Sequence, residues 1–203
     1  MKKDHMNNQL TDIYTPPHDI KSRDVREEDV KRVLVASQIM AGLCRSKMGG
    51  YESGLALAHS QITEEDPLRF FVTVAGDIII NPIITRQTKV GVHKMEGCLT
   101  YYLDPPKMVS RSYKIEVSYR TITDKEELSE VIHKKVKGLQ AQVFQHEIGH
   151  MEGKYIYDKS KYDKRYTDYK SAQKAIESSK KDADNKKSRV RKDSENDGKQ
   201  LGS

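Results

Sequence analysis

The sequence predicts an α+β fold, in which antiparallel β-strands pack around a central helix bearing an H-E-x-x-H motif and a further helix lies near the N-terminus. Three observations support this prediction. Apolar residues recur at helical spacing early in the chain, short apolar runs of strand length follow, and a second stretch of helical spacing carries the motif.

The first helix is expected over residues 26–48. The following sequence GGYESG contains three glycines and ends the helical pattern. We expect this helix to be a packing element, because its apolar positions recur near helical spacing at Val30, Val33, Leu34, Ile39, Met40 and Leu43.

Four segments are expected to be strands. SGLALA (53–58) is short and apolar, and RFFVTVA (69–75) and IIINPII (78–84) are separated by a Gly-Asp pair typical of a hairpin turn. YKIEVSYRTI (113–122) alternates apolar and polar residues, which predicts a half-buried strand. All four precede the motif.

The motif helix is expected over residues 139–153. Gly149 in its interior costs about 1 kcal/mol relative to alanine, which weakens the helical pattern slightly. The positions expected along one face of this helix are Leu139, Val143, His146 and His150.

Positive charge is concentrated at the C-terminal end of the 203-residue chain. Residues 159–203 contain 14 Lys or Arg against 8 Asp or Glu, which accounts for the whole formal charge of +6. The chain is only 35% hydrophobic, and its mean hydropathy is −0.79. We therefore predict a catalytic domain over 1–158 and a basic tail over 159–203, disordered or partly helical. This tail favours contact with phosphate, while the balanced charge of the domain argues against a DNA-binding fold.

The cysteines and the N-terminus indicate a cytoplasmic protein. Cys44 and Cys98 form no disulfide framework, so a reducing compartment is expected. No apolar run follows the lysines at the N-terminus, and no stretch approaches ~18 apolar residues. Neither a secretory signal nor contact with a membrane is predicted.

The motif at residues 146–150 is suited to metal-assisted hydrolysis. In a helix, His146 and His150 lie about one turn apart on the same side, where both rings can reach one ion. Glu147 lies about 100° around the axis, within reach of a metal-bound water. A catalytic site of this kind usually has a third protein ligand.

There are three alternatives for the third ligand. A zinc-protease pattern with a third histidine fails, because that position is Ile156. A Glu-ligated metalloprotease would need Glu177 or Glu195, and both lie in the tail. Cys98, upstream in MEGCLTYY, is the better candidate, since a His₂Cys set can hold Zn²⁺ or Fe²⁺.

Three ordered motifs resemble the signatures of the peptide deformylases. They are GLALAHSQ (54–61), EGCLT (96–100) and QHEIGH (145–150), and INPII (80–84) and MEGKYIYD (151–158) are also similar to family segments. The resemblance implies an α+β hydrolase that removes the formyl group from the N-formylmethionine of nascent chains. Its implied metal is one Fe²⁺ per chain, replaceable by Zn²⁺ or another divalent ion.

The resemblance also implies a role for each matching residue. Glu147 would be the general base and later the acid, and the Gln61 side chain and the Leu99 backbone N–H would hold the oxyanion. Glu96 is a candidate for orienting a ligand histidine. The implied metal ligands are Cys98, His146 and His150. The residues expected to bind substrate are Gly54, Leu55, Ala56, Leu57, Leu139 and Val143.

The chain departs from the family motifs at several positions. Thr100 replaces a serine and Gly149 an aspartate. The usual arginine is missing near Pro106, with Lys107 or Arg111 as candidate replacements. The first motif departs at Ala56, which replaces a glycine, and at His59 and Ser60, where we expect His59 at the surface or supporting the metal site.

These departures leave a second function open, that of a catalytically silent deformylase-like protein that binds metal or peptide. They suggest a divergent member, either organellar or phage-encoded. For the active enzyme, the expected setting is the cytoplasm of a bacterium or of a phage-infected host, with an organelle as the alternative. The basic tail would contact the ribosome, where formylated chains emerge.

Overall fold

The computed structural model describes residues 20–46, 54–63, 65–89, 91–101 and 105–157, all within the first of the chain's two units, Met1–Asp163. The predicted tail, 159–203, lies outside the described residues, so its disorder and its helical content stay predictions. Among the described helices, none is both long and apolar enough to cross a membrane.

The N-terminal helix is confirmed with narrower bounds. Helix α1 spans Val30–Arg45 and follows a 3₁₀ turn, η1, at Glu27–Asp29. The Asp29 carboxylate accepts a hydrogen bond from the Arg26 backbone N–H at 2.9 Å, which fixes the start of this region. As expected for a packing element, α1 buries Val33, Met40 and Leu43.

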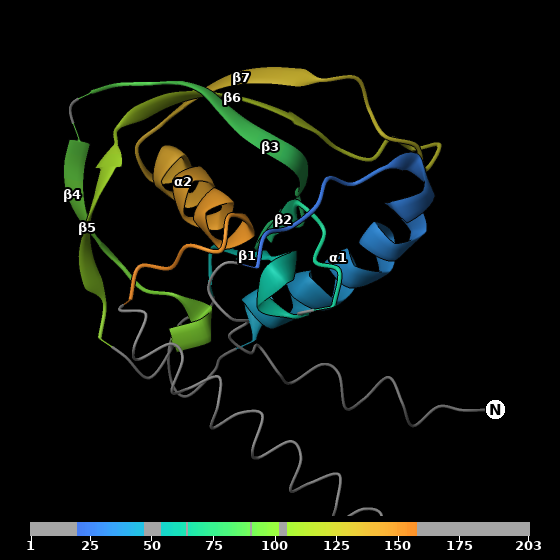
Figure 1. Ribbon diagram of the computed structural model, residues 1–203, viewed down its shortest axis with the longest axis horizontal. Coiled ribbons are helices and arrows are strands. Elements are labelled where there is room, and N and C mark those ends of the chain that lie inside the picture. The colour runs from blue at the N-terminus through green and yellow to red at the C-terminus, as the bar shows by residue number, and fades with distance from the viewer. Residues whose placement is uncertain (1–19, 47–53, 64, 90, 102–104, 158–203) are drawn as a thin grey trace, which may run out of the picture. The chain divides into compact units, whose positions relative to one another are not determined.

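The main sheet has five antiparallel strands in the order β1-β2-β3-β6-β7. It arches over the second helix, α2, as Figure 1 shows. The α+β class and the antiparallel pairing are therefore confirmed. The strands are β1 (Ala56–Ala58), β2 (Phe70–Thr73), β3 (Ile78–Gln87), β6 (Lys114–Arg120) and β7 (Ile132–Lys137), and α2 spans Leu139–Met151.

The predicted hairpin joins β2 to β3. Gly76 has a φ of +96°, a backbone conformation that residues other than glycine rarely adopt. Its N–H donates to the Thr73 carbonyl at 2.8 Å. The Gly-Asp pair therefore makes the turn that its sequence predicts.

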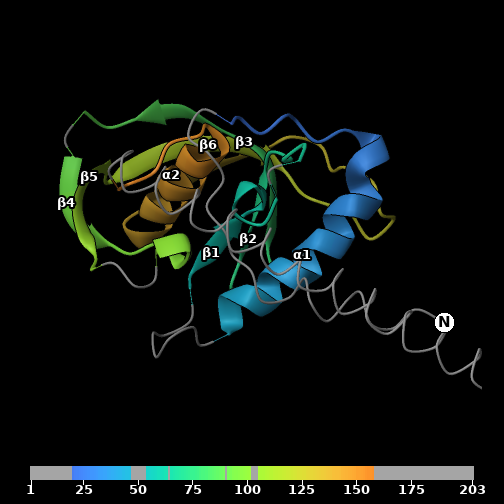
Figure 2. The ribbon, with the colours of Figure 1, turned by 60° about the horizontal axis from the view of Figure 1, so that its bottom comes forward.

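Successive side chains of β1 and β2 point to opposite faces of the sheet, so the hydrophobic core is divided into two clusters. Leu57 and Val72 pack on the α1 side, whereas Ala56 and Phe71 pack on the α2 side. Figure 2 shows β1 and β2 between the two helices. Residues on the α2 side of these strands are therefore the ones available to a site on α2.

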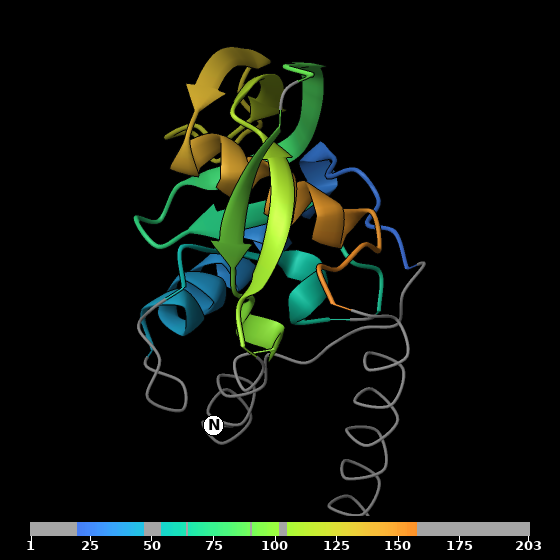
Figure 3. The ribbon, with the colours of Figure 1, turned by 90° about the vertical axis from the view of Figure 1, so that its left-hand side faces the viewer.

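A two-stranded ribbon was not predicted from the sequence. Strands β4 (Gly91–Glu96) and β5 (Lys107–Ser112) pair antiparallel, and β5 contacts α2, beside which the ribbon lies in Figure 3. Most of the β4 side chains are exposed. No apolar alternation marks the ribbon, because neither of its faces packs extensively against a core.

Two short 3₁₀ turns carry residues from the first two motifs. The turn η2 spans His59–Gln61 directly after β1, and η3 spans Leu99–Tyr101 directly after Cys98. Helix α2 carries the third motif and contacts β1, β5, β7 and η2. The contacts with β1 and η2 bring the first motif to α2, and the second motif follows β4, the partner of β5 in the ribbon.

Candidate active site

The three predicted metal ligands converge on one point. One ligand atom from each of Cys98, His146 and His150 lies within 4.8 Å of the other two. The Nε2 atom of His150 is 3.0 Å from His146 Nε2 and 3.4 Å from Cys98 Sγ. A tetrahedral ion bound at about 2.0 Å to nitrogen and about 2.3 Å to sulfur would separate the two nitrogens by about 3.3 Å and nitrogen from sulfur by about 3.5 Å. The donor set therefore fits a single divalent ion.

The buried carboxylate of Glu96 holds the His146 ring in place. Glu96 Oε2 lies 3.0 Å from His146 Nδ1, which leaves Nε2 directed at the other ligands. Arg111 donates two hydrogen bonds to the same carboxylate, at 2.9 and 2.8 Å. Burial raises the pKa of Glu96, but the hydrogen bonds from Arg111 and His146 outweigh it and lower this pKa to about 2. Glu96 therefore stays ionised and can orient the ligand.

Hydrogen bonds fix both ends of the Gln61 side-chain amide. Its Oε1 accepts from the Ala58 backbone N–H at 2.8 Å. Its Nε2 donates to Thr100 Oγ1 at 2.9 Å and lies 3.6 Å from Cys98 Sγ. Because Ala58 occupies the acceptor, the donor end of the amide must face the metal ligands.

Glu147 lies beside the ligands and is almost wholly buried, with 4% of its surface exposed. Burial raises the pKa of its carboxyl to about 7. Its Oε2 atom has no hydrogen-bond partner among the described residues. This carboxyl lines the cleft described next, so it can exchange a proton with a molecule bound there.

A cleft of about 340 Å³ opens at these residues. A Cβ atom added at Gly54 would lie only 2.8 Å from Leu99 Cγ, so a larger residue there would force the Leu99 side chain to move. The lining includes five of the six predicted substrate residues, which are Gly54, Leu55, Ala56, Leu139 and Val143, together with Gln61, Cys98, Leu99, His146 and Glu147.

Leu57 is the one predicted substrate residue that does not line the cleft. This residue is fully buried in the α1 core and does not line the cleft. Its neighbour Ala56 does line it, because successive side chains of a strand point to opposite faces.

His59 is also displaced from its expected position. It is buried rather than at the surface, its ring stacks on Phe70, and its Nδ1 accepts from the Leu68 backbone N–H at 3.0 Å. Burial lowers the pKa of this ring to about 3. His59 therefore acts as a neutral packing residue.

Neither candidate for the missing arginine enters the cleft. Lys107 is exposed and lines a separate hollow on the other side of the ribbon and α2, as Arg111 does. The Arg111 guanidinium is already engaged by Glu96. Arg111 therefore supports the metal site, and Pro106 is the residue at the cleft itself.

Sequence reasoning missed several residues of the site, among them Met95, Gln142 and Thr100. Met95 precedes Glu96 on the ribbon, which the sequence did not predict. Gln142 lies one helical turn before His146, and that spacing could have revealed it. Thr100 was recognised only as a departure from the motif, yet its hydroxyl holds Gln61.

Two histidines, a cysteine and a buried carboxyl around one cleft define the class of a metal-dependent hydrolase site. Comparison with known families identifies it further, because the model of the polypeptide deformylase family matches residues 17–166. The chain belongs to this family.

Curated relatives agree with this assignment. The chain is 31% identical to a peptide deformylase of Levilactobacillus brevis over 146 residues, which cover 64% of this chain and 72% of the relative. It is 31% identical to a peptide deformylase of Thermotoga neapolitana over 118 residues, which cover 55% of this chain and 65% of that relative. The second alignment thus spans slightly less than two thirds of the relative.

Solved structures show the same fold. The structure of PDF from a Vibrio parahaemolyticus bacteriophage, in complex with actinonin, aligns with a TM-score of 0.53 at 29% identity, covering 71% of this chain and 100% of that one. The peptide deformylase of Thermotoga maritima aligns with a TM-score of 0.52 at 26% identity, covering 75% and 90% of the two chains.

Proposed function

We propose that this chain is an active peptide deformylase, which hydrolyses the N-formyl group of N-formylmethionine at the start of nascent polypeptides and releases formate. One observation carries the proposal. Cys98 clusters with both motif histidines beside the Gln61 amide, which hydrogen bonds hold in place. The cysteine favours this reading over a Glu-ligated metalloprotease, which has no such use for a thiolate ligand.

A divalent ion held by Cys98, His146 and His150 would polarise the formyl oxygen and lower the pKa of a bound water. Glu147 takes a proton from the attacking water while the oxygen of that water bonds to the formyl carbon. The C–N bond then breaks, and Glu147 returns the proton to the departing amine nitrogen. The products are formate and a peptide with a free amino terminus.

The negative charge that develops on the formyl oxygen needs fixed donors. Gln61 Nε2 is held at the metal ligands by the Ala58 and Thr100 contacts, so it requires little reorganisation to donate. The Leu99 backbone N–H follows Cys98 directly and is the second proposed donor. Such donors stabilise the transition state more than the neutral substrate.

The apolar side of the cleft suits a methionine side chain. Leu55, Met95, Leu139 and Val143 line it, and none of them carries a charge. Gly54 and Ala56 present backbone at the same wall, where the peptide can approach closely. Substrate would therefore place its formyl group at the ligands and its side chain among these residues.

The finer features of the proposal rest on family resemblance. Fe²⁺ is the proposed native ion, although a His₂Cys set would hold Zn²⁺ equally well. Helix α2 is the proposed central helix of the fold, because it contacts elements from both sheets. The proposed setting is the cytoplasm, where formylated chains are made.

Ribosome contact through the basic tail is part of the proposal. Deleting residues 167–203 removes much of the positive charge and keeps every residue that the family model matches. We expect unchanged turnover of short peptides and weaker, less salt-dependent binding to ribosomes. Equal ribosome binding by the truncated and full-length chains would contradict the contact.

The proposed function is tested by formate release from a formyl-Met tripeptide. The chain is purified without oxygen, and its iron and zinc are quantified before the assay. Cys98→Ser should lose both bound metal and formate release. Cys44→Ala is the control, because Cys44 is buried in the α1 core and is not one of the clustered ligands.

Two results would overturn this function. One metal per chain without formate release would identify a silent metal-binding protein. Full metal affinity and activity in Cys98→Ser would exclude the proposed ligand set.

A further inference from the structure

Two methionines lie opposite each other on the two-stranded ribbon. Met95 on β4 and Met108 on β5 are direct partners across the ribbon, so their side chains leave the same face of it. Both are well exposed, with 56% and 57% of their surface open to solvent. These two side chains are therefore accessible to small solutes.

The other methionines that the structure describes differ from this pair. Met40 in α1 and Met151 at the end of α2 are fully buried, one in each cluster of the core. Oxidants convert the thioether of a methionine to a sulfoxide, which is polar, and an exposed thioether is the easier one to reach. The ribbon pair should therefore react first, and the buried pair provides an internal reference in the same chain.

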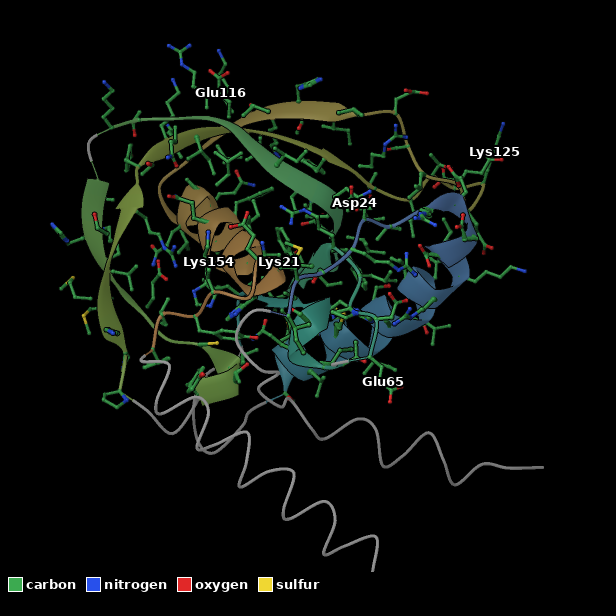
Figure 4. The ribbon with its side chains drawn as sticks, viewed as in Figure 1. Lys21, Asp24, Glu65, Glu116, Lys125 and Lys154 are labelled. Carbon is green, nitrogen blue, oxygen red and sulfur yellow. The ribbon has the colours of Figure 1, made fainter. Side chains whose placement is uncertain are left out.

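The two ribbon methionines border different spaces. Met95 lines the active-site cleft on its apolar side, with Leu55 and Leu139. Met108 lines the separate hollow on the other side of the ribbon, together with Lys154, which is labelled in Figure 4. Since the two residues are equally exposed, they should be oxidised alike, but only the change at Met95 alters the wall of the cleft.

The chemical change at Met95 is the transfer of one oxygen atom. The lone pair of the sulfur attacks one oxygen of hydrogen peroxide, so that an S–O bond forms while the O–O bond breaks. The leaving hydroxide takes the proton of the transferred hydroxyl group, and the products are a sulfoxide and water. The sulfur is oxidised and the peroxide is reduced. Because methionine sulfoxide reductases return the sulfoxide to the thioether, the change is reversible.

We propose that Met95 is a peroxide-sensitive modification site, at which oxidation weakens the binding of formylated peptide. This inference rests on the proposed function, because the affected ligand is the substrate of that reaction. The sulfoxide introduces a polar S–O group into an apolar wall, and covering this group without a hydrogen bond disfavours binding. The groups that act on the formyl bond stay unchanged, so oxidation raises KM and leaves kcat as it was.

The test measures formate release from a formyl-Met tripeptide before and after a pulse of hydrogen peroxide. The chain is loaded with Zn²⁺, which has no redox chemistry of its own, and its zinc content after the pulse reports whether the thiolate of Cys98 is intact. Catalase removes the peroxide before substrate is added, because the substrate also contains methionine. Mass spectrometry of proteolytic peptides gives the extent of oxidation at each methionine.

Two measurements have expected values in the wild type. The sulfoxide should form at Met95 and Met108 while Met40 and Met151 stay reduced. The KM for the tripeptide should rise by about threefold to tenfold, since the apolar wall is partly lost. Treatment with methionine sulfoxide reductases and their reductant should restore the original KM.

Leucine substitutions at the two ribbon positions form a matched pair. Met95→Leu keeps an apolar side chain that cannot accept oxygen, so its KM should be the same before and after the pulse. Met108→Leu removes the neighbouring thioether, which borders the other hollow, and should show the same rise in KM as the wild type.

Each contrary result has one meaning. An equal rise in KM in Met95→Leu and the wild type, or an unchanged KM once Met95 carries the sulfoxide, overturns the inference while leaving deformylation intact. The inference is also wrong if Met95 stays reduced while Met108 is oxidised, or if activity is lost only together with zinc, which would locate the damage at Cys98. Absence of formate release before the pulse overturns the proposed function and the inference with it.

Discussion

The two ends of the active-site cleft differ in how their side chains are held. At the inner end, Gln61 and Glu96 are 2% and 4% exposed, and each makes hydrogen bonds through both ends of its polar group. At the outer end, Leu55, Met95 and Leu139 are at least half exposed. The inner end is preorganised for chemistry, whereas the outer end offers apolar surface for recognition.

Departures from the family motifs follow the same division. Thr100 replaces a serine at the inner end, yet its hydroxyl still accepts the hydrogen bond from Gln61. Pro106 lines the cleft where an arginine is usual, and among the described residues no arginine lines it. The chain therefore keeps the groups proposed to act on the formyl bond, whereas the arginine position at the outer part of the cleft is altered.

The largest effect is expected at the inner end, from Glu147→Gln. An amide of the same shape cannot shuttle the proton between water and amine, so kcat should fall by about 10³-fold. Metal content should stay at the wild-type level, because Glu147 is not among the clustered ligands. Formate assays paired with metal analysis check both expectations, and near-normal kcat would remove Glu147 from the mechanism.

Gln61 provides the second test of preorganisation. Gln61→Glu keeps an acceptor for the Ala58 N–H but loses the donor, so kcat should fall by about 10²-fold or more with little change in KM. The control is Thr100→Ser, which keeps the hydroxyl that holds the amide and should remain near wild type. An effect of Gln61→Glu on KM alone would indicate a binding role instead.

A substitution of Arg111 tests whether the Glu96–Arg111 pair beside His146 contributes to metal affinity. Arg111→Met removes the cation that pairs with Glu96, and we expect metal affinity to weaken by about 10-fold to 100-fold. Competition with a chelator measures this affinity directly. Lys107→Met, on the same strand but without this contact, should bind metal normally. Equal metal affinity in the two variants would argue against a supporting role for Arg111.

The residues at the inner end of the cleft were also easier to predict from the sequence than those at the outer end. His146 and His150 share a helix, so helical spacing alone places them together. Cys98 could be chosen only by elimination and resemblance, since its approach to the histidines depends on how separate elements pack. Arg111 was expected only as an alternative to Lys107 in replacing the missing arginine, because nothing in the unpredicted ribbon revealed its pairing with Glu96.

Errors elsewhere have similar causes. Leu57 was placed in the substrate stretch with its neighbours, although strand alternation turns it into the α1 core. His59 was expected to be accessible or near the metal, but its stacking on Phe70 and its bond to Leu68 form only in the folded chain. The helices and the β2–β3 hairpin were predicted because their signals are local.

Substitutions at the outer end of the cleft should reduce activity less than substitutions at the inner end. Leu139→Ser removes apolar surface from the mouth of the cleft, so KM for a formyl-Met peptide should rise by roughly threefold to tenfold with kcat unchanged. Val131→Ser is the control, because Val131 is similarly exposed but does not line the cleft. A fall in kcat in Leu139→Ser would show that the mouth also positions the reacting group.

The smallest expected effect is on the stability of the fold, and it has opposite signs at two glycines, Gly149 within α2 and Gly138 before it. At Gly149 an added Cβ meets only the Lys154 carbonyl, at 3.6 Å, so Gly149→Ala should stabilise the fold by about 0.5–1 kcal/mol. Gly138, before α2, has a φ of +60°, where alanine is strained, so Gly138→Ala should destabilise the fold by about 1 kcal/mol. Denaturant unfolding measures both changes. Because neither glycine lines the cleft, turnover by Gly149→Ala should match the wild type, and a loss would show that the inner end depends on the freedom of this helix.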